Sequence, residues 1–166
     1  MKIAVDRSLG RLARWLRILG EDAAWEPDLA DADLISLAGR GRMVVTRTRR
    51  VAEKLAPDRV VFITAPDPAG QLAQAARALG LSLDPERFFS RCARCNAPVV
   101  SLPREEALGR VPDYVYETQP AFTRCPACEK IFWPGTHRTR ALDFFQTILS
   151  SRAARAGGKE AKPDHS

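Results

Sequence analysis

The sequence lacks any run of about 18 uninterrupted apolar residues, which is the length that a membrane-spanning helix needs. We also do not expect a secretory signal peptide, because charged side chains interrupt the apolar residues of the first twenty positions. These charged residues are Lys2, Asp6, Arg7, Arg11, Arg14 and Arg17. We therefore expect a cytoplasmic protein that has no membrane partner.

Negative charge is in deficit, because 20 Asp and Glu residues face 26 Lys and Arg residues, for a formal net charge of +6. The composition is otherwise typical of a folded protein, with 45% hydrophobic and 28% charged residues. An excess of positive charge favours a polyanionic partner such as a nucleic acid.

Short apolar runs alternate with helical patterns over the first half of the chain. The expected strands are residues 2–6, 21–26, 43–46 and 59–63. The expected helices are residues 9–19, 34–39, 51–55 and 68–80. This alternation predicts a three-layer α/β domain with a parallel sheet over residues 1–85.

Residues 2–19 join the first expected strand to a helix that has two unlike faces. At about 100° per residue its leucines form one apolar stripe, whereas Arg11, Arg14 and Arg17 fall on the opposite side. Asp6 stands at the carboxyl end of the strand, where ligand sites form in open α/β sheets. We predict a site there. The alternative is that Asp6 only caps the helix and that the arginines form a solvated face.

Cysteine is scarce, and all four cysteines fall in two C-x-x-C pairs, Cys92 with Cys95 and Cys125 with Cys128. In a cytoplasmic protein we expect thiols or metal ligands rather than disulfides. Two such turns aim four thiolates at one point and complete a tetrahedral Zn²⁺ shell, and a closed shell of this kind is structural. We therefore predict a zinc ribbon over residues 86–136. The alternative is a pair of redox motifs, but those normally lie at a helix start.

The chain between the two cysteine pairs has room for a hairpin made of residues 98–102 and 114–116, with a turn at 105–106. Basic and aromatic residues surround the cysteines, and this mixture suits single-stranded nucleic acid through phosphate contacts and base stacking. The alternative is that the aromatic side chains pack the ribbon onto the α/β domain, which we expect for Phe122 and Trp133.

After the cysteine module, residues 137–153 have the pattern of an amphipathic helix with Phe145 and Ile148 on its apolar side. Residues 154–166 are small, charged and turn-forming, so we expect a disordered tail.

Acidic residues at strand and helix ends are the usual ligands of a hard divalent cation, and Asp6 and Asp31 occupy such places. Mg²⁺ and Mn²⁺ prefer oxygen ligands, and a site of this kind positions and activates water for attack on a phosphodiester. A third acid is expected after the strand that ends at Thr46. The sequence there is Thr46-Arg47-Thr48-Arg49-Arg50, which contains none.

These segments resemble the Mut-seven C-terminal RNase domain family, in which a PIN-like nuclease fold precedes a zinc ribbon. The resemblance extends over residues 2–145. The segments that carry it are residues 6–17 with Leu19-Gly20, Asp31-x-x-Leu34 with Ala38, the two cysteine pairs, residues 111–122, and Phe132-Trp-Pro-Gly-Thr-His137.

The resemblance implies a metal-dependent ribonuclease centre in which Asp6 and Asp31 are family acids. The family's third acid lies in a Thr-Arg-Asp segment that here reads Thr46-Arg47-Thr48, so only neutral hydroxyl groups remain at these two threonines. Two carboxylates should hold Mg²⁺ or Mn²⁺ more weakly than three, while the neighbouring arginines repel a cation and attract a phosphate. The candidates for binding substrate phosphate are Arg11, Arg14, Arg47 and His137, the last of which is alternatively a cap or a packed surface residue.

Two functions on RNA follow from these residues. The first is a Mg²⁺- or Mn²⁺-dependent endoribonuclease, a hydrolase, with weak activity because Thr48 replaces the third acid. The alternative is a catalytically impaired RNA-binding protein with a structural zinc ribbon. A zinc-stabilised protein-interaction module explains the cysteines but not the basic helix. The expected partner is single-stranded RNA, and the sequence does not specify an oligomeric state.

Overall fold

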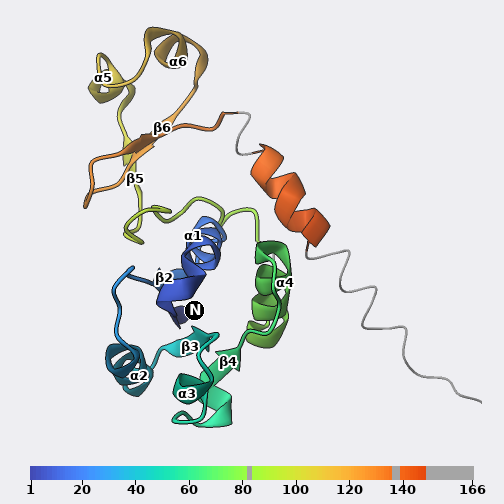
Figure 1. Ribbon diagram of the computed structural model, residues 1–166. Helices are drawn as coiled ribbons and strands as arrows, with labels where there is room; N and C mark the ends of the chain where they lie inside the picture. Colours follow the sequence, from blue (N-terminus) through green and yellow to red (C-terminus); the bar gives the residue numbers. More distant parts are fainter. Residues whose placement is uncertain (82–83, 136–138, 149–166) are drawn as a thin grey trace, which may run out of the picture.

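The computed structural model describes residues 1–81, 84–135 and 139–148, and these residues form two separate sheets. The first sheet is parallel and has the strand order β2-β1-β3-β4, so the parallel sheet that the sequence predicts is confirmed (Figure 1). Its strands are β1 (Lys2–Val5), β2 (Asp22–Ala24), β3 (Met43–Thr46) and β4 (Val60–Phe62).

Helices cover both faces of this sheet (Figure 1). One face carries α1 (Gly10–Ile18), which follows the short 3-10 turn η1 (Arg7–Leu9), and α4 (Pro68–Leu79). The other face carries α2 (Asp31–Gly39) and α3 (Arg49–Ala52). A second 3-10 turn, η2 (Pro57–Arg59), leads into β4.

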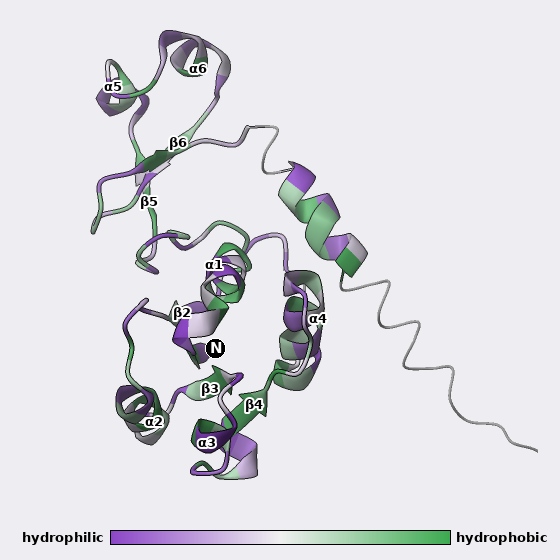
Figure 2. Cartoon of the chain, viewed as in Figure 1, coloured by the Kyte–Doolittle hydropathy of each residue, from purple (hydrophilic) through white to green (hydrophobic). Residues whose placement is uncertain are grey.

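Strands β1, β3 and β4 each contribute to two hydrophobic cores, because successive side chains of a strand point to opposite faces. Ile3 and Val5 of β1 pack with the leucines of α1 and α4, whereas Ala4 between them packs with Leu34 of α2 and Val51 of α3. Figure 2 shows β3 and β4 as strongly hydrophobic segments, which is typical of parallel strands that are covered on both sides.

The second sheet is antiparallel, with the order β5-β6-β7. Its strands are β5 (Val100–Leu102), β6 (Phe122–Arg124) and β7 (Ile131–Phe132), and the connection from β5 to β6 contains α5 (Arg104–Ala107) and α6 (Asp113–Thr118). In Figure 1 the loop before β5 lies next to α1 and β2, where Arg17 donates to the carbonyl of Arg94 and Asn96 accepts from the N–H of Ala23.

The predicted hairpin partner at residues 114–116 is wrong, because these residues lie in α6 and β5 pairs instead with β6. Likewise, the predicted turn at 105–106 lies in α5. The alternating residues of 114–116 suggest a strand, but Pro112 stands at the N-cap and Asp113 in the first turn, and both favour a helix start. Val115 then packs with Phe122 in a small third core.

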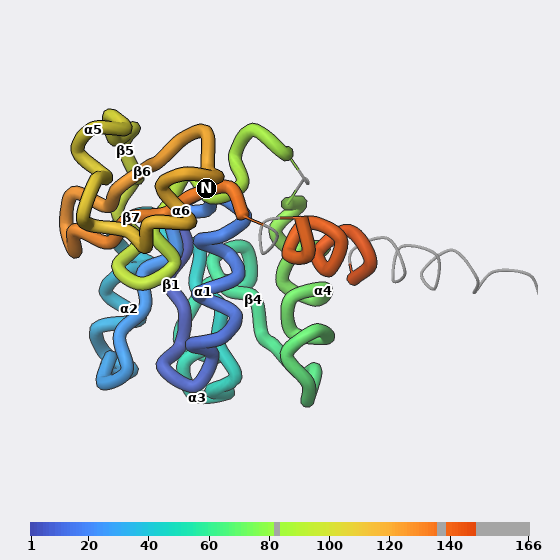
Figure 3. Tube along the Cα trace, turned by 90° about the horizontal axis from the view of Figure 1, so that it is seen from above, coloured from blue at the N-terminus to red at the C-terminus, as the bar shows by residue number. Residues whose placement is uncertain are grey.

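The helical residues 139–148 pack against the first sheet's larger core through Phe145 and Ile148, which agrees with the predicted apolar face (Figure 3). The ring of Phe145 lies 6.3 Å from that of Trp15 and 6.0 Å from that of Phe88, centroid to centroid. The remaining positions of the predicted helix, and the predicted tail, lie outside the described residues. In the described chain, no helix is long and apolar enough to cross a membrane.

Candidate metal centre and acidic centre

The four cysteines converge on one point. Their Sγ atoms all lie within 4.8 Å of one another, with 3.7 Å between Cys92 and Cys128 and 3.2 Å between Cys95 and Cys125. Four thiolates at about 2.3 Å from a tetrahedral Zn²⁺ would stand about 3.8 Å apart. The donor atoms and their spacing therefore fit a zinc ion, as the cysteine spacing predicts.

Both cysteine pairs use the same backbone turn. The N–H of Asn96 donates to the carbonyl of Cys92, and the N–H of Glu129 donates to the carbonyl of Cys125, each at 2.9 Å. Asn96 and Glu129 both have positive φ values, 67° and 57°, which turn the chain sharply after the second cysteine of each pair. Two equivalent turns thus bring four sulfur atoms together from segments that are distant in the sequence.

The clustered thiols perturb one another's protonation. Burial disfavours the thiolate of Cys125, but hydrogen bonds from the Cys128 backbone and the Cys95 thiol outweigh burial and lower the pKa of Cys125 to about 7. At Cys95, burial and the hydrogen bond to Cys125 raise the pKa to about 12. Without a cation the four thiols cannot all ionise at neutral pH, and a bound Zn²⁺ would replace the shared protons.

Arg17 joins the first sheet to the cysteine module. Its Nη1 donates to the carbonyls of Ala93 (3.3 Å) and Arg94 (2.5 Å) in the first cysteine turn, and its Nε donates to the carbonyl of Ala23 in β2 (2.9 Å). Only 4% of Arg17 is exposed, so the prediction that it lies on a solvated or ligand-binding face is wrong.

The environment of Arg17 explains why the sequence pattern misplaces it. Burial lowers the pKa of Arg17, and the negative charge of Glu26 offsets part of that effect. A stripe on an isolated helix does not show that a second module will cover part of it. Arg11 and Arg14, by contrast, are exposed on α1 as predicted.

Asn96 makes the second link between the two sheets. Its side-chain oxygen accepts a hydrogen bond from the N–H of Ala23 (3.0 Å), and its amide nitrogen donates to Asp22 (2.7 Å). The cysteine module therefore supplies a hydrogen-bond partner for a backbone N–H group on the open edge of strand β2.

Asp6 lies at the point where the strand order of the first sheet reverses, between β1 and β3. It is buried, and both carboxylate oxygens are occupied. Oδ2 accepts hydrogen bonds from the hydroxyl groups of Thr46 (2.6 Å) and Thr48 (2.9 Å), and Oδ1 accepts from the hydroxyl (3.0 Å) and N–H (2.9 Å) of Ser8. Asp6 is thus the N-cap of η1, and it follows the carboxyl end of β1, which is where ligand sites form in open α/β sheets.

These hydrogen bonds keep Asp6 ionised. Burial by itself raises the pKa of Asp6, but the donors Thr46, Ser8 and Thr48 outweigh that effect and lower the pKa below its ordinary value. The result is a buried anion that hydroxyl and amide donors stabilise.

Asp31 is the first residue of α2 and lies in its first turn, as predicted. Its Oδ2 accepts a hydrogen bond from Nη2 of Arg50 at 2.8 Å, an ion pair between the first turns of α2 and α3. The partner of Asp31 is therefore a cation from the chain itself.

The predicted acidic site is thus brought together only in part. Thr46 and Thr48 contact Asp6, whereas Asp31 pairs with Arg50. Within the described ranges, the four cysteines are the one group of three or more His, Cys, Asp or Glu side chains placed to hold a metal ion. Mg²⁺ or Mn²⁺ at this place would find one carboxylate, that of Asp6, while Thr46 and Thr48 offer only neutral oxygens.

Two residues of this centre were missed at the sequence level. Ser8 had a detectable signal, because a serine two residues after an aspartate is typical of a turn in which the aspartate accepts hydrogen bonds. Arg50 had none, because its contact with Asp31 depends on how two helices pack. Of the predicted phosphate-binding residues, Arg47 is exposed next to Thr48, and His137 lies outside the described residues.

The sequence profile of the Mut7-C RNAse domain matches residues 1–145. The chain belongs to the Mut7-C RNAse domain family. Nothing among curated proteins or solved structures matches the chain. Membership in the Mut7-C family indicates a nuclease-like function on RNA. This chain departs from the Thr-Arg-Asp pattern expected for the family at Thr48, and there a hydroxyl group donates to Asp6.

Proposed function

We propose that this protein binds single-stranded RNA through a PIN-like ribonuclease domain whose cleavage centre is impaired. The observation that carries the proposal is the hydrogen bond from Thr48 to Asp6, at 2.9 Å. Where a third carboxylate would share a cation with Asp6, Thr48 instead supplies a proton donor. The pair of residues is therefore stable without a divalent cation.

The charges around the centre support binding of a phosphate backbone. Arg11 and Arg14 on α1 and Arg47 after β3 are all exposed, so they remain accessible to phosphate. Arginine binds phosphate by paired hydrogen bonds as well as by charge. The net charge of +6 adds a long-range attraction for RNA.

In this proposal the cysteine module, residues 86–136, is a zinc ribbon with a structural role. Four cysteine sulfurs within 4.8 Å would hold Zn²⁺ in a closed shell, which stabilises a segment with a small core of its own. Four cysteines without a disulfide are typical of a reducing compartment, which supports a cytoplasmic location.

A second candidate is a weak Mg²⁺- or Mn²⁺-dependent endoribonuclease. It is favoured by the position of Asp6, an ionised carboxylate at the edge of the sheet where ligand sites form. It requires the Asp31–Arg50 ion pair to open, because Asp31 is the second family acid and its carboxylate is bound to Arg50 instead of a metal ion.

The test uses the zinc-loaded full chain and a single-stranded RNA labelled at one end. We expect binding that weakens steeply with salt and does not depend on Mg²⁺ or Mn²⁺, without cleavage in either metal. Cleavage that is abolished by Asp6→Asn would instead support the endoribonuclease. Absence of RNA binding at low salt would contradict both candidates and would favour a protein-interaction module.

A further inference from the structure

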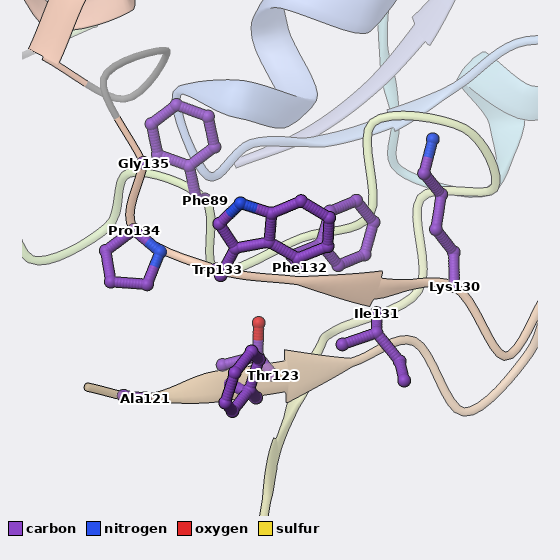
Figure 4. Close-up of a pocket in the computed structure, with 10 residues that line it drawn as sticks. Phe89, Ala121, Thr123, Lys130, Ile131, Phe132, Trp133, Pro134 and Gly135 are labelled. Atoms are coloured by element: carbon purple, nitrogen blue, oxygen red, sulfur yellow. The ribbon is translucent and has the colours of Figure 1, made fainter. Parts of the chain in front are cut away.

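A cavity of about 540 Å³ is lined by residues of the second sheet and includes neither the four cysteines nor Asp6. It is lined mainly by β6, β7 and the residues that follow β7, and Phe89 closes it from the loop before the first cysteine pair (Figure 4). Its volume is within the range of pockets that take small organic groups.

Aromatic side chains form the walls of this cavity. Phe132 and Trp133 stand on the side of β7 that faces Phe89, whereas Ile131 points to the other side of the strand (Figure 4). Trp133 is 38% exposed, so the prediction that it mainly packs the module onto the first sheet is wrong. The same prediction is wrong for Phe122, which is buried but packs with Leu102 and Val115 in the core of the cysteine module itself.

The wall that Phe89 provides is fixed by the backbone. The N–H of Phe89 donates to the carbonyl of Ile18 at the end of α1 (2.8 Å), and Phe89 has a positive φ of 60°, which is uncommon for a bulky residue. Gly20 allows this approach, because a Cβ there would lie 2.4 Å from the carbonyl oxygen of Arg87. The loop is therefore anchored to α1, and the cavity has a preformed wall.

Unused polar groups accompany the aromatic walls. The ammonium group of Lys130 lies 5.9 Å from the ring centroid of Phe132, and across the described residues it forms no ion pair. The neighbouring Glu129 is instead paired with Arg110 and Arg124. In the same part of the chain, the indole N–H of Trp133 and the hydroxyl of Thr123 have no hydrogen-bond partner.

We propose that this cavity binds an unstacked nucleobase of single-stranded RNA. Flat aromatic walls accept the face of any base, and Lys130 supplies the positive charge that the adjoining phosphate requires. Trp133 and Thr123 offer polar contacts to the base edge. An apolar peptide would contact the aromatic walls but would not require the positive charge of Lys130.

The cavity is separate from the Asp6 centre, because Phe89 contacts the last residue of α1 and Asp6 precedes its first turn. The length of α1, roughly 13 Å for its nine residues, lies between them. The inference rests on the proposed binding of RNA and adds a second contact site with a preference for single strands.

The test measures the dissociation constant of the zinc-loaded full chain for a single-stranded oligouridylate by fluorescence anisotropy. We expect Trp133→Ala to raise the dissociation constant about tenfold through loss of stacking, whereas Trp133→Phe should keep most of the affinity. Tyr114→Ala is the matched control, because Tyr114 is 68% exposed on the same module and does not line the cavity. Tryptophan fluorescence should fall on binding, and this quenching should be absent from Trp133→Phe.

A zinc measurement on each variant checks that the module is folded. If Trp133→Ala loses zinc, the test depends on Trp133→Phe, in which the fluorescence quenching by RNA should be absent. If RNA binds with unchanged affinity in Trp133→Ala, or with no quenching that Trp133→Phe removes, the base-binding cavity is wrong while the proposed function stands. If wild-type protein binds no RNA, both are wrong. A dimer in sedimentation that Trp133→Ala abolishes, with RNA affinity unchanged, would show that a second copy of the chain occupies the cavity.

Discussion

The cysteine centre and the Asp6 centre both contain side chains with metal-ligand chemistry, but the fold treats them differently. The four thiols converge on one point, and at neutral pH they can all ionise together only with a cation between them. The acids are already satisfied: Asp6 accepts from threonine and serine hydroxyls, and Asp31 pairs with Arg50. Ligand-type residues therefore indicate a metal site only where the protein itself supplies no competing donors.

The largest expected effect is on the cysteine centre. Cys125→Ser removes one thiolate from the zinc shell, and structural zinc sites contribute about 10 kcal/mol or more to folding. We expect this variant to lose zinc and to unfold over residues 92–132, as measured by metal content and by circular dichroism. Ala127→Ser, an exposed position in the same turn, is the control and should keep one zinc per chain. Full zinc occupancy in Cys125→Ser would contradict the four-thiolate site.

A smaller effect is expected where the two parts of the molecule meet. Arg17→Ala leaves the carbonyls of Ala23, Ala93 and Arg94 without this buried donor, and we expect it to destabilise the protein by about 3 kcal/mol in urea unfolding. Arg14→Ala, on the exposed side of the same helix, should change stability by less than about 0.5 kcal/mol. Equal effects of the two substitutions would mean that Arg17 does not couple the sheets.

Acid should weaken the Asp6 centre. Because the pKa of Asp6 is lowered in the folded protein, the unfolded chain binds the proton more readily. The carboxylate thus contributes stability above its unfolded pKa near 3.8, and this contribution disappears as the pH falls through the lower folded pKa.

We expect Asp6→Asn to be less stable than wild type by about 2 kcal/mol at pH 7, because the hydroxyl groups lose an ionised acceptor. The difference in unfolding free energy between wild type and Asp6→Asn should shrink as the pH falls below 4. Because acid affects the cysteines of both proteins equally, that effect cancels in the difference. A difference that is constant with pH would mean that Asp6 is not held as an anion.

The smallest effect concerns RNA. If Arg47 contacts a phosphate, Arg47→Ala should reduce the slope of log affinity against log salt by about 0.7 on a single-stranded RNA. Arg59→Ala is the control, because Arg59 is also exposed but precedes β4 and so lies at the opposite edge of the sheet from Asp6. Identical slopes for the two variants would remove Arg47 from the RNA-binding surface.

Local patterns in the sequence predict much of this molecule. The apolar runs at β1 and β3 and the helical patterns between them predict the parallel sheet, and the cysteine spacing predicts the thiol cluster. The position of Thr48 beside Asp6 also follows, because adjacent parallel strands end at the same edge of a sheet.

Contacts between elements are what local patterns do not contain. The pairing of Asp31 with Arg50 and the burial of Arg17 depend on how two helices, or two modules, pack together. The exposure of Trp133 likewise depends on how the cysteine module packs, which its local sequence does not specify. The helix α6 is missed for a different reason, since its alternating residues fit a strand pattern and only Pro112 and Asp113 signal a helix start.

The most direct test of the account is to place an acid at position 48. Thr48→Asp should raise the affinity for Mn²⁺ about tenfold in calorimetry, because a second carboxylate joins Asp6, and it should introduce RNA cleavage that wild type lacks. Thr48→Asn, which is similar in size but uncharged, should do neither. Cleavage by the wild-type protein that depends on Asp6, or a Thr48→Asp variant with unchanged metal affinity and no cleavage, would contradict the account.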